Sequence, residues 1–331
     1  MAWTSIGLGL FGTGIVTLAL ARGVALGDPP PEREAAAPPP ARLRPHVAFI
    51  AADDEYRSEI TMPLLARMVE RTGVARISVH LAADPRTGKP NEYSKTGLED
   101  FEALRYASAL VVYMRFAQLE PEVLEAMLAP CEAGRPIVGF RTSTHSFLYP
   151  ADHPARGWND GWGRRFLGTP WQFHHGHLSR TRVLPPTPEA AGHPLLRGVE
   201  IPAEGLVVRG WLYHVEPLPP DCTVLLWGES VNSANPSAPQ RQPLLWTREL
   251  PVPEASAPND TTAPSQSDPA GERRRQRVAV TTLGHPSDFE EPVLWKIAAA
   301  MVLWSIDRED AIPEDGVEVF LPEGYNPPLT R

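Results

Sequence analysis

Residues 46–71 read HVAFIAADDEYRSEITMPLLARMVER, and this stretch decides the fold. Residues 46–52 are an almost continuous apolar run, which is typical of a strand buried on both faces. From Ser58 to Arg71 the apolar residues recur at helical spacing and share one face. That face carries Ile60, Leu64, Leu65, Met68 and Val69. A buried strand followed by an amphipathic helix predicts a unit of a parallel sheet.

The same alternation of strand and helix continues toward the C-terminus. Strands are predicted at residues 75–82, 109–116 and 136–140, and helices at residues 98–107 and 121–133. Pro121 suits the first turn of the second of these helices, and Gly134 suits its left-handed C-terminal cap. The predicted fold class is therefore α/β, an open and mainly parallel sheet flanked by helices.

After residue 140 this rhythm is lost. Strands are predicted at residues 180–184, 207–212, 223–228, 242–250 and 277–283, which we interpret as a β-rich elaboration of the sheet. Residues 251–276 have the Pro- and Ser-rich composition of a disordered loop insertion. A helix at residues 290–306 is apolar nearly all round and should be buried. The predicted domain spans residues 46–310, followed by a C-terminal tail at residues 311–331.

The N-terminal region differs from the domain in composition. An apolar, uncharged run from Ile6 to Ala21 precedes Arg22, as in a secretory signal peptide or N-terminal anchor occupying residues 1–27. An anchor that crosses a bilayer needs about 20 apolar residues, and Arg22 interrupts this run before that length is reached. A buried N-terminal helix is a further alternative. Residues 28–45 are rich in Pro and Ala and predict a stiff linker. We therefore expect export to the periplasm or the cell exterior, or a membrane tether.

Charge and cysteine content exclude two classes of protein. The net charge of −9 argues against nucleic acid as a partner, because binding to phosphate backbones needs a basic surface. The chain has two cysteines, Cys131 and Cys222, too few for a disulfide scaffold. Neither has the neighbouring histidine that a thiolate nucleophile would need. The sequence leaves open whether the two cysteines form a disulfide bond with each other.

Polar residues follow four of the predicted strands. Ligands of open α/β sheets bind outside the carboxyl ends of the strands, so these residues are expected to form one site. They are Asp54, Glu55 and Tyr56 after the first strand, Arg115 after the third, Arg141, Thr142 and His145 after the fourth, and His285 after the last. Each group alone also has a structural explanation, such as an acidic turn before a helix or a histidine that caps a loop.

A second polar group, His174-His175-Gly176-His177, lies in the β-rich region. Alternate residues of an extended chain face the same way, so His175 and His177 are predicted to lie side by side. Two imidazoles suit a divalent metal such as zinc, although a third ligand must then come from a distant segment. Hydrogen bonding to a substrate, or proton transfer, is the alternative. His214 is predicted to join this group, and Trp171 to pack against a sugar or within the core.

Five segments together resemble the ThuA-like (trehalose-utilisation) family. They are residues 52–59, 139–147, 171–177, 211–214 and 282–286. The family has a fold similar to that of class I glutamine amidotransferases, so the resemblance implies a flavodoxin-like parallel sheet flanked by helices. It also implies a role in carbohydrate metabolism, with keto-derivatives of disaccharides such as trehalose as substrates.

One departure from the amidotransferase pattern limits the chemistry. Those enzymes place a nucleophilic cysteine after the strand that corresponds to residues 136–140, where this chain has Arg141-Thr142. Glutamine hydrolysis and cysteine proteolysis are therefore excluded. We expect a non-cysteine hydrolase, lyase or isomerase that acts on a sugar derivative. Its predicted catalytic residues are His145, His177, His285, Arg141 and Asp54, and its predicted substrate-binding residues are Arg115, Glu55, Tyr56, Thr142, Trp171, His175 and His214. The alternative is a non-catalytic, exported module that binds carbohydrate or serves assembly.

Overall fold

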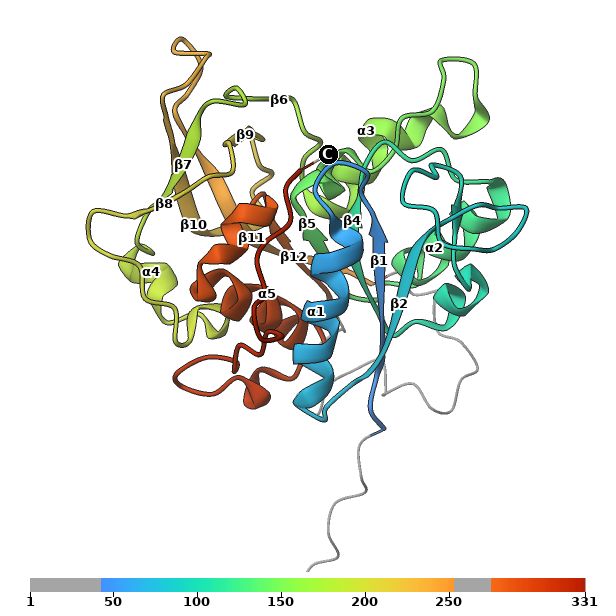
Figure 1. Cartoon of the computed structure of the whole chain (residues 1–331), viewed down its shortest axis with the longest axis horizontal. Helices are drawn as coiled ribbons and strands as arrows, with labels where there is room; N and C mark the ends of the chain where they lie inside the picture. The colour runs from blue at the N-terminus through green and yellow to red at the C-terminus, as the bar shows by residue number, and fades with distance from the viewer. Residues whose placement is uncertain (1–42, 253–274, 331) are drawn as a thin grey trace, which may run out of the picture. The chain divides into compact units, whose positions relative to one another are not determined.

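The computed structural model describes residues 43–252 and 275–330 (Figure 1). The expected signal peptide or anchor at residues 1–27 lies outside the described residues, as do most of the linker and most of the predicted loop insertion at residues 251–276. Within the described ranges, no helix has both the length and the apolar character that a membrane span requires.

A ten-stranded sheet, in the order β3-β2-β1-β4-β5-β12-β11-β10-β7-β8, forms the centre of the domain. Its parallel core consists of β2 (Arg76–Ala83), β1 (His46–Ala52), β4 (Ala109–Met114), β5 (Ile137–Phe140) and β12 (Arg275–Thr281). Strands β1, β4 and β5 are buried along almost their whole length, as their continuous apolar runs predict. The predicted α/β class with a parallel core is confirmed.

Antiparallel strands extend this core on one side, seen at the left of Figure 1. They are β11 (Arg241–Pro251), β10 (Cys222–Val231), β7 (Arg180–Val183) and β8 (Leu206–Val208). The short strand β3 (Gly97–Leu98) borders β2 at the other edge, also antiparallel. The predicted β-rich elaboration is thus a continuation of the same sheet.

The predicted strand at residues 207–212 is wrong beyond Val208. There the chain leaves the sheet, and β9 (Tyr213–His214) pairs instead with β6 (Phe173–His174) in a separate two-stranded sheet. A backbone hydrogen bond from His175 to the Leu212 carbonyl, 3.0 Å long, continues this pairing. The pairing carries residues 211–214 away from β8, to the histidine-rich segment that follows residue 170.

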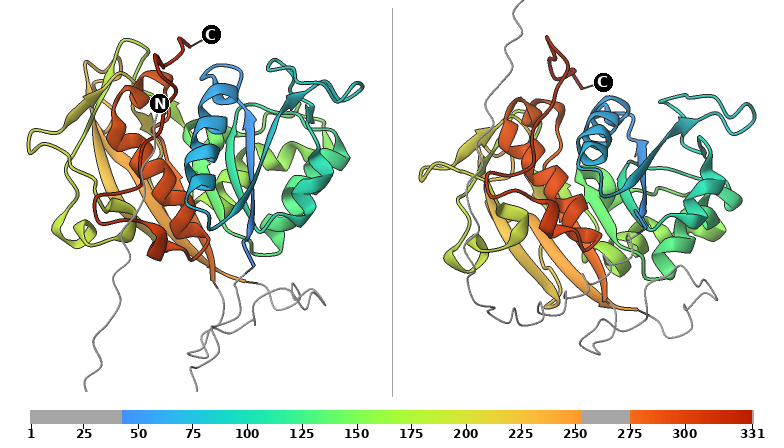
Figure 2. Two further views of the ribbon diagram at one scale, coloured as in Figure 1. Left: turned by 60° about the horizontal axis from the view of Figure 1, so that its bottom comes forward. Right: turned by 90° about the horizontal axis from the view of Figure 1, so that it is seen from below.

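Helices cover both faces of the parallel strands. Helix α1 (Ser58–Arg71) has the predicted bounds, and it packs beside α5 (Pro292–Ser305) on one face (Figures 1 and 2). Helix α2 (Pro121–Glu132) covers the other face. The predicted helix at residues 98–107 is instead a 3-10 helix, Phe101–Tyr106, because only Leu104 of that helix is fully buried and Leu98 belongs to β3. Short helices α3 (Trp158–Trp162) and α4 (Pro188–Ala191) lie in the connections.

The order of the strands places their carboxyl ends at one edge. From β1 the chain crosses to β2 on one side, and from β4 it crosses to β5 on the other, so the direction of winding reverses between β1 and β4. In open α/β sheets this reversal marks the ligand site. The ends of β1, β4, β5 and β12 meet there, and so do the polar residues that follow them.

The C-terminal residues complete the core. Ile312 and Val317 are buried, and the Tyr325 ring lies 6.1 Å from Trp295 of α5. The segment set apart in the sequence as a tail therefore packs on the domain. Cys131 and Cys222 are not bonded to each other. Burial raises the pKa of Cys222 to about 11 and that of Cys131 further, so both thiols are protonated at neutral pH.

Candidate functional site

The bend after β5 begins at Arg141. Its φ of 41° is left-handed, a conformation that non-glycine residues seldom adopt, and the chain then continues as a buried 3-10 helix, Arg141–His145. Gly284, just beyond β12, passes close to this bend with a φ of 140°. A Cβ at Gly284 would lie 3.2 Å from the Arg141 Cβ, so the close approach of the two segments favours glycine there.

The Arg141 side chain is enclosed by aromatic rings. It is 1% exposed, and its guanidinium carbon lies 4.3 Å from the ring centre of Tyr56 and 4.6 Å from that of Tyr213. The Trp211 ring lies 5.2 Å away. Nη1 donates to the carbonyl oxygen of Thr282 at 3.1 Å, whereas the buried Nε and Nη2 make no hydrogen bond with any residue that the structure describes. Burying donors without acceptors costs free energy, so the unpaired donors of this guanidinium indicate a candidate ligand site.

Two buried carboxylates lie close to Arg141. Asp288 Oδ1 accepts from the backbone N–H of Gly210 at 2.8 Å, and Oδ2 accepts from those of Gly284 and His285 at 3.0 Å. Burial raises the pKa of Asp288, and the charge of Arg141 opposes the rise. Burial likewise raises the pKa of Asp53, which accepts hydrogen bonds from the Thr142 hydroxyl and from two backbone N–H groups. Asp288 and Arg141 attract each other electrostatically, although no direct ion pair joins them among the described residues.

Histidines surround the same aromatic rings. The His145 ring lies 4.8 Å from Trp171 and 5.7 Å from Tyr213. On the other side, His285 lies 5.2 Å and His177 4.6 Å from Trp211. The structure therefore brings together Arg141, His145, His177 and His285, which three distant segments supply. Their catalytic roles stay a prediction. We call these four residues, with His174, Tyr56, Trp171, Trp211 and Tyr213, the Arg141 cluster.

Three imidazoles of the Arg141 cluster are uncharged at neutral pH. Burial, together with the positive charge of Arg141, lowers the pKa of His285 to about 3. Burial and the neighbouring His177 lower the pKa of His174 to about 4, and Arg141 adds to this. Burial and the charges of Arg115 and Arg141 hold the pKa of His145 well below its usual range.

The hydrogen bonds of these rings assign their tautomers. The backbone N–H of Ser287 donates to Nδ1 of His285 at 3.1 Å, and that of Gly176 donates to Nδ1 of His174 at 3.0 Å. A neutral ring whose Nδ1 accepts must carry its proton on Nε2. The Thr144 hydroxyl donates to the Arg141 carbonyl and therefore accepts from Nδ1 of His145, 3.3 Å away. His285 and His174 are thus Nε2–H donors, and His145 keeps a lone pair on Nε2.

The prediction that His175 and His177 lie side by side is wrong. Gly176 has a φ of 102°, which turns the chain so that His177 lies 4.5 Å from His174 instead. His175 lies on the other side of β6, where its Nδ1 is 2.9 Å from Ser233 Oγ. His214 stacks on Phe173 on that side, at 4.5 Å. The pair predicted to bind substrate, His175 and His214, thus lies outside the Arg141 cluster.

Arg115, predicted to bind substrate, and Asp54, predicted to act in catalysis, belong to one network of ion pairs. Arg115 pairs with Asp54 at 3.2 Å and with Glu55 at 2.9 Å, and Lys95 pairs with Asp54 at 2.6 Å. Burial favours the neutral form of Asp54, but Lys95 and Arg115 outweigh it and hold its pKa below the ordinary value. The lowered pKa makes Asp54 a poor proton donor at neutral pH. Thr142, predicted to bind substrate, is fully buried and donates its hydroxyl to Asp53 instead.

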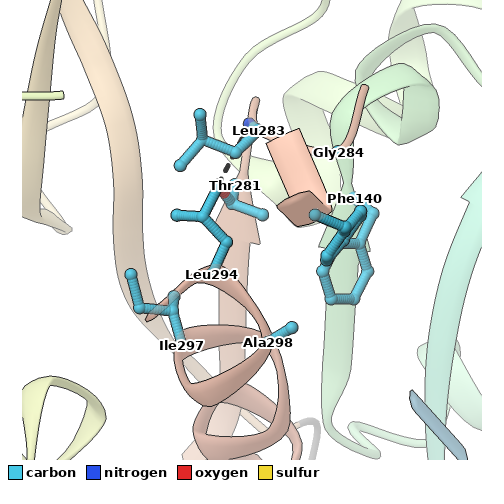
Figure 3. Close-up of a pocket in the computed structure, with 8 residues that line it drawn as sticks. Phe140, Thr281, Leu283, Gly284, Leu294, Ile297 and Ala298 are labelled. Carbon is cyan, nitrogen blue, oxygen red and sulfur yellow. Dashed lines mark hydrogen bonds between the residues drawn. The ribbon is translucent and has the colours of Figure 1, made fainter. Parts of the chain in front are cut away.

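Two features of the described residues concern possible ligands. No three or more His, Cys, Asp or Glu side chains there are grouped as metal ligands. A small cavity lies between β5, β12 and the start of α5 (Figure 3). Its lining is apolar apart from Thr281 and Gly284, and no histidine reaches it. We regard this cavity as a feature of core packing rather than part of the Arg141 cluster.

Comparison with solved structures finds chains of low similarity. The chain is similar to a ThuA-like protein. That protein, from Parabacteroides merdae, aligns at 11% identity with a TM-score of 0.49, over 79% of this chain and 90% of its own. The N-terminal domain of IFT52 aligns at 11% identity, with a TM-score of 0.38, over 78% and 96%. The protein SMU.1228c aligns at 10% identity, with a TM-score of 0.33, over 61% and 71%.

At these identities and TM-scores, the similarities show nothing about the chemistry of this chain. No family model and no curated protein matches the chain. The chemistry proposed below therefore depends on the residues of the Arg141 cluster.

Proposed function

We propose that the chain is a non-cysteine enzyme that transfers protons on a keto-derivative of a sugar. The observation that carries the proposal is the buried guanidinium of Arg141, whose Nε and Nη2 have no partner among the described residues, beside three uncharged imidazoles. The indole N–H groups of Trp171 and Trp211 are also buried and unpaired in the described part of the chain. Because donors exceed acceptors, the cluster suits a ligand rich in oxygen acceptors. The sugar class is inferred from the sequence resemblance and from the aromatic rings.

The assigned tautomers divide the work between the histidines. In the proposed step, Nε2 of His145 takes a proton from the carbon next to a carbonyl, and the electron pair of the broken C–H bond moves to the carbonyl oxygen. Nε2–H of His285 donates to that oxygen, and the positive charge of Arg141 stabilises it. The proton then returns to carbon, or the electron pair expels a leaving group. Neutral imidazole is a suitable electrophile for such an oxygen.

A non-catalytic binding module is the second candidate. The pKa values of about 3 for His285 and about 4 for His174 lie far below neutral pH. General acid–base catalysis is most efficient when the pKa lies near the working pH. The pKa of His145 is also held well below its usual range. All three rings therefore suit hydrogen bonding to a ligand, and the same residues could hold a carbohydrate without reaction.

Deuterium exchange into a 3-keto-disaccharide distinguishes the two candidates. In D2O, with protein assayed for metal, the wild type is expected to exchange the proton next to the carbonyl, as seen by NMR. The variant His145→Gln should lose about 10²–10⁴-fold of the rate, because the base is gone. His285→Asn should lose about 10²-fold, because asparagine keeps the loop cap and removes one donor to the oxyanion.

His193→Asn is the matched control for these variants. His193 also accepts a backbone N–H at Nδ1, from Leu195, but it lies 5.5 Å from Trp304 at the far end of α5. Its exchange rate should equal that of the wild type. Undiminished exchange in both site variants contradicts the assignment. Binding of the keto-sugar without exchange in the wild type supports the module instead.

We also propose that residues 1–27 direct export, on the strength of the apolar run from Ile6 to Ala21. Expression of the full chain in a bacterium, followed by N-terminal sequencing of the mature protein, tests this. A periplasmic protein that begins between residues 22 and 28 is expected. A cytoplasmic protein that retains Met1 contradicts export.

A further inference from the structure

We propose that Arg141 holds a carboxylate group of the ligand through the edge of its guanidinium that carries Nε and Nη2. This inference rests on the proposed function of the Arg141 cluster and specifies its substrate class as a sugar acid. The two N–H groups on this edge are parallel and match the two oxygens of a carboxylate. They are also the two guanidinium nitrogens that have no hydrogen-bond partner in the described structure, since Nη1 is bonded to the Thr282 carbonyl.

The guanidinium is held in position before any ligand arrives. The bond from Nη1 to Thr282 fixes one end, and the rings of Tyr56 and Tyr213 lie 4.3 Å and 4.6 Å from its central carbon. The left-handed backbone of Arg141 is tied down by the Thr144 hydroxyl, which donates to its carbonyl at 3.2 Å. A donor pair held in this way loses little freedom on binding, which favours a tight two-pronged contact.

No anionic oxygen of the described residues fills the place of a ligand carboxylate, although the Tyr56 hydroxyl interacts with Arg141. The two oxygens of Asp288 are occupied by three backbone N–H groups. The Tyr56 hydroxyl lies close to the guanidinium, but burial raises the pKa of Tyr56, and that of Tyr213 is raised further, so both phenols stay neutral. The edge that carries Nε and Nη2 therefore lacks an anionic acceptor among the described residues.

Charge and shape favour a carboxylate over a phosphate. Arg115, the other cation that acts on His145, is neutralised by Asp54 and Glu55. Arg209, which acts on His285, pairs with Glu290 at 3.7 Å. A phosphate dianion would therefore meet Arg141 as the one cation near the cluster without a carboxylate partner among the described residues, and Asp288, which interacts with Arg141, would repel it. A planar monoanion matches both the single charge and the aromatic rings beside the guanidinium.

Trp211 provides a signal for this binding event. It contacts the rings of Tyr56, His177 and His285, lies 5.2 Å from the Arg141 guanidinium and is 7% exposed. Because the edge of Arg141 is covered, a ligand reaches it only if neighbouring rings move, and the fluorescence of Trp211 reports such movement.

The test compares four probes by calorimetry and tryptophan fluorescence: D-glucuronate, its methyl ester, D-glucose and glucose 6-phosphate. Glucuronate is expected to bind about tenfold or more tightly than the ester or glucose, as expected for a charge-assisted bidentate contact. Arg141→Lys keeps the charge and removes the paired N–H groups, so most of this preference should vanish. Arg248→Lys, a partly buried arginine that pairs with Asp221 at 2.9 Å, is the matched control and should keep it.

NMR titration of the wild type gives a measurement that does not depend on a variant folding. A carboxylate on Arg141 offsets its charge, so glucuronate should raise the pKa of His285 and of His174, and the methyl ester should not. Unmoved histidine pKa values, or a glucuronate preference that survives in Arg141→Lys, overturn the inference.

The remaining outcomes separate this inference from the proposed function. If glucuronate, its methyl ester and glucose bind equally, Arg141 does not hold a carboxylate. Proton exchange on the 3-keto-disaccharide would in that case still support the proposed enzyme activity. Tighter binding of glucose 6-phosphate overturns the choice of anion. A carboxylate preference that depends on Arg141, without exchange on any keto-sugar, supports the carboxylate and contradicts the enzyme.

Discussion

Replacing Asp288 with alanine is expected to lower the free energy of unfolding by about 3–5 kcal/mol. Asp288 is fully buried, and its carboxylate accepts three backbone N–H groups that bind the loop before β9 to the turn after β12. It also attracts Arg141 electrostatically. The substitution leaves three buried donors without an acceptor and a buried guanidinium without an anion, and both are costly.

A double-mutant cycle with Arg141→Met separates the two costs. Methionine removes the buried cation, so the combined variant should be more stable than the sum of the single changes predicts, by about 1–3 kcal/mol. Urea denaturation of the four proteins measures this coupling. Asp221→Ala is the control, because Asp221 is a surface partner of Arg248 and should cost at most about 1 kcal/mol. Strict additivity would show that Arg141 and Asp288 do not stabilise each other.

The parallel core could be predicted from sequence because its signals are local. Strand β1 and helix α1 have the predicted bounds, since the apolar run at His46–Ala52 and the helical periodicity at Ser58–Arg71 each need only neighbouring residues. Once the strands are placed, the parallel order brings Arg141, His145 and His285 to one edge. Convergence of these residues therefore follows from the fold class alone.

The rest of the Arg141 cluster depends on contacts between distant segments. Tyr213 and Trp211 reach Arg141 because β9 pairs with β6, and residues 207–212 carry a strand pattern that gives no sign of this departure. His174 replaces His175 as the partner of His177 because Gly176 adopts a positive φ, which sequence alternation ignores.

The ion pairs beside the Arg141 cluster could not be predicted from the sequence either. Asp54 and Arg115 neutralise each other, and Asp53, one residue away, is the carboxylate that is buried beneath the bend. A sequence signal did exist for Asp288. His285-Pro286-Ser287-Asp288 has the spacing of a capping box, and the structure forms one.

Acid is expected to destabilise the wild type more steeply than the variant His174→Asn/His285→Asn. In the folded state the pKa values of these histidines are about 4 and about 3, whereas in the unfolded chain they return to about 6.5. Between these limits the unfolded chain binds more protons, so the stability that is fully present above pH 6.5 is lost as the pH falls toward 4. Each group contributes at most about 1.4 kcal/mol per pH unit, less for His174 because it is half exposed.

Comparison with the variant removes the effect of other groups. Asp53 and Asp288 have raised pKa values, so their contribution has the opposite sign: it is present at low pH and lost as the pH rises through the folded pKa. Both proteins contain these carboxylates, so the difference between their urea stabilities at pH 7 and pH 4.5 isolates the histidines. Asparagine preserves the acceptors for Gly176 and Ser287, which keeps the two loops capped.

Arg141 links this acid sensitivity to the ligand. Part of the depression of both histidine pKa values comes from its charge, and burial supplies the larger part. In an Arg141→Met background the stability difference between histidine and asparagine proteins at pH 4.5 should therefore shrink without vanishing. Glucuronate at saturation should shrink it in the same way, since a bound carboxylate cancels the same charge. If Arg141→Met leaves this stability difference unchanged, the charge of Arg141 does not lower the two histidine pKa values. The histidines would then be electrostatically independent of the proposed anion site.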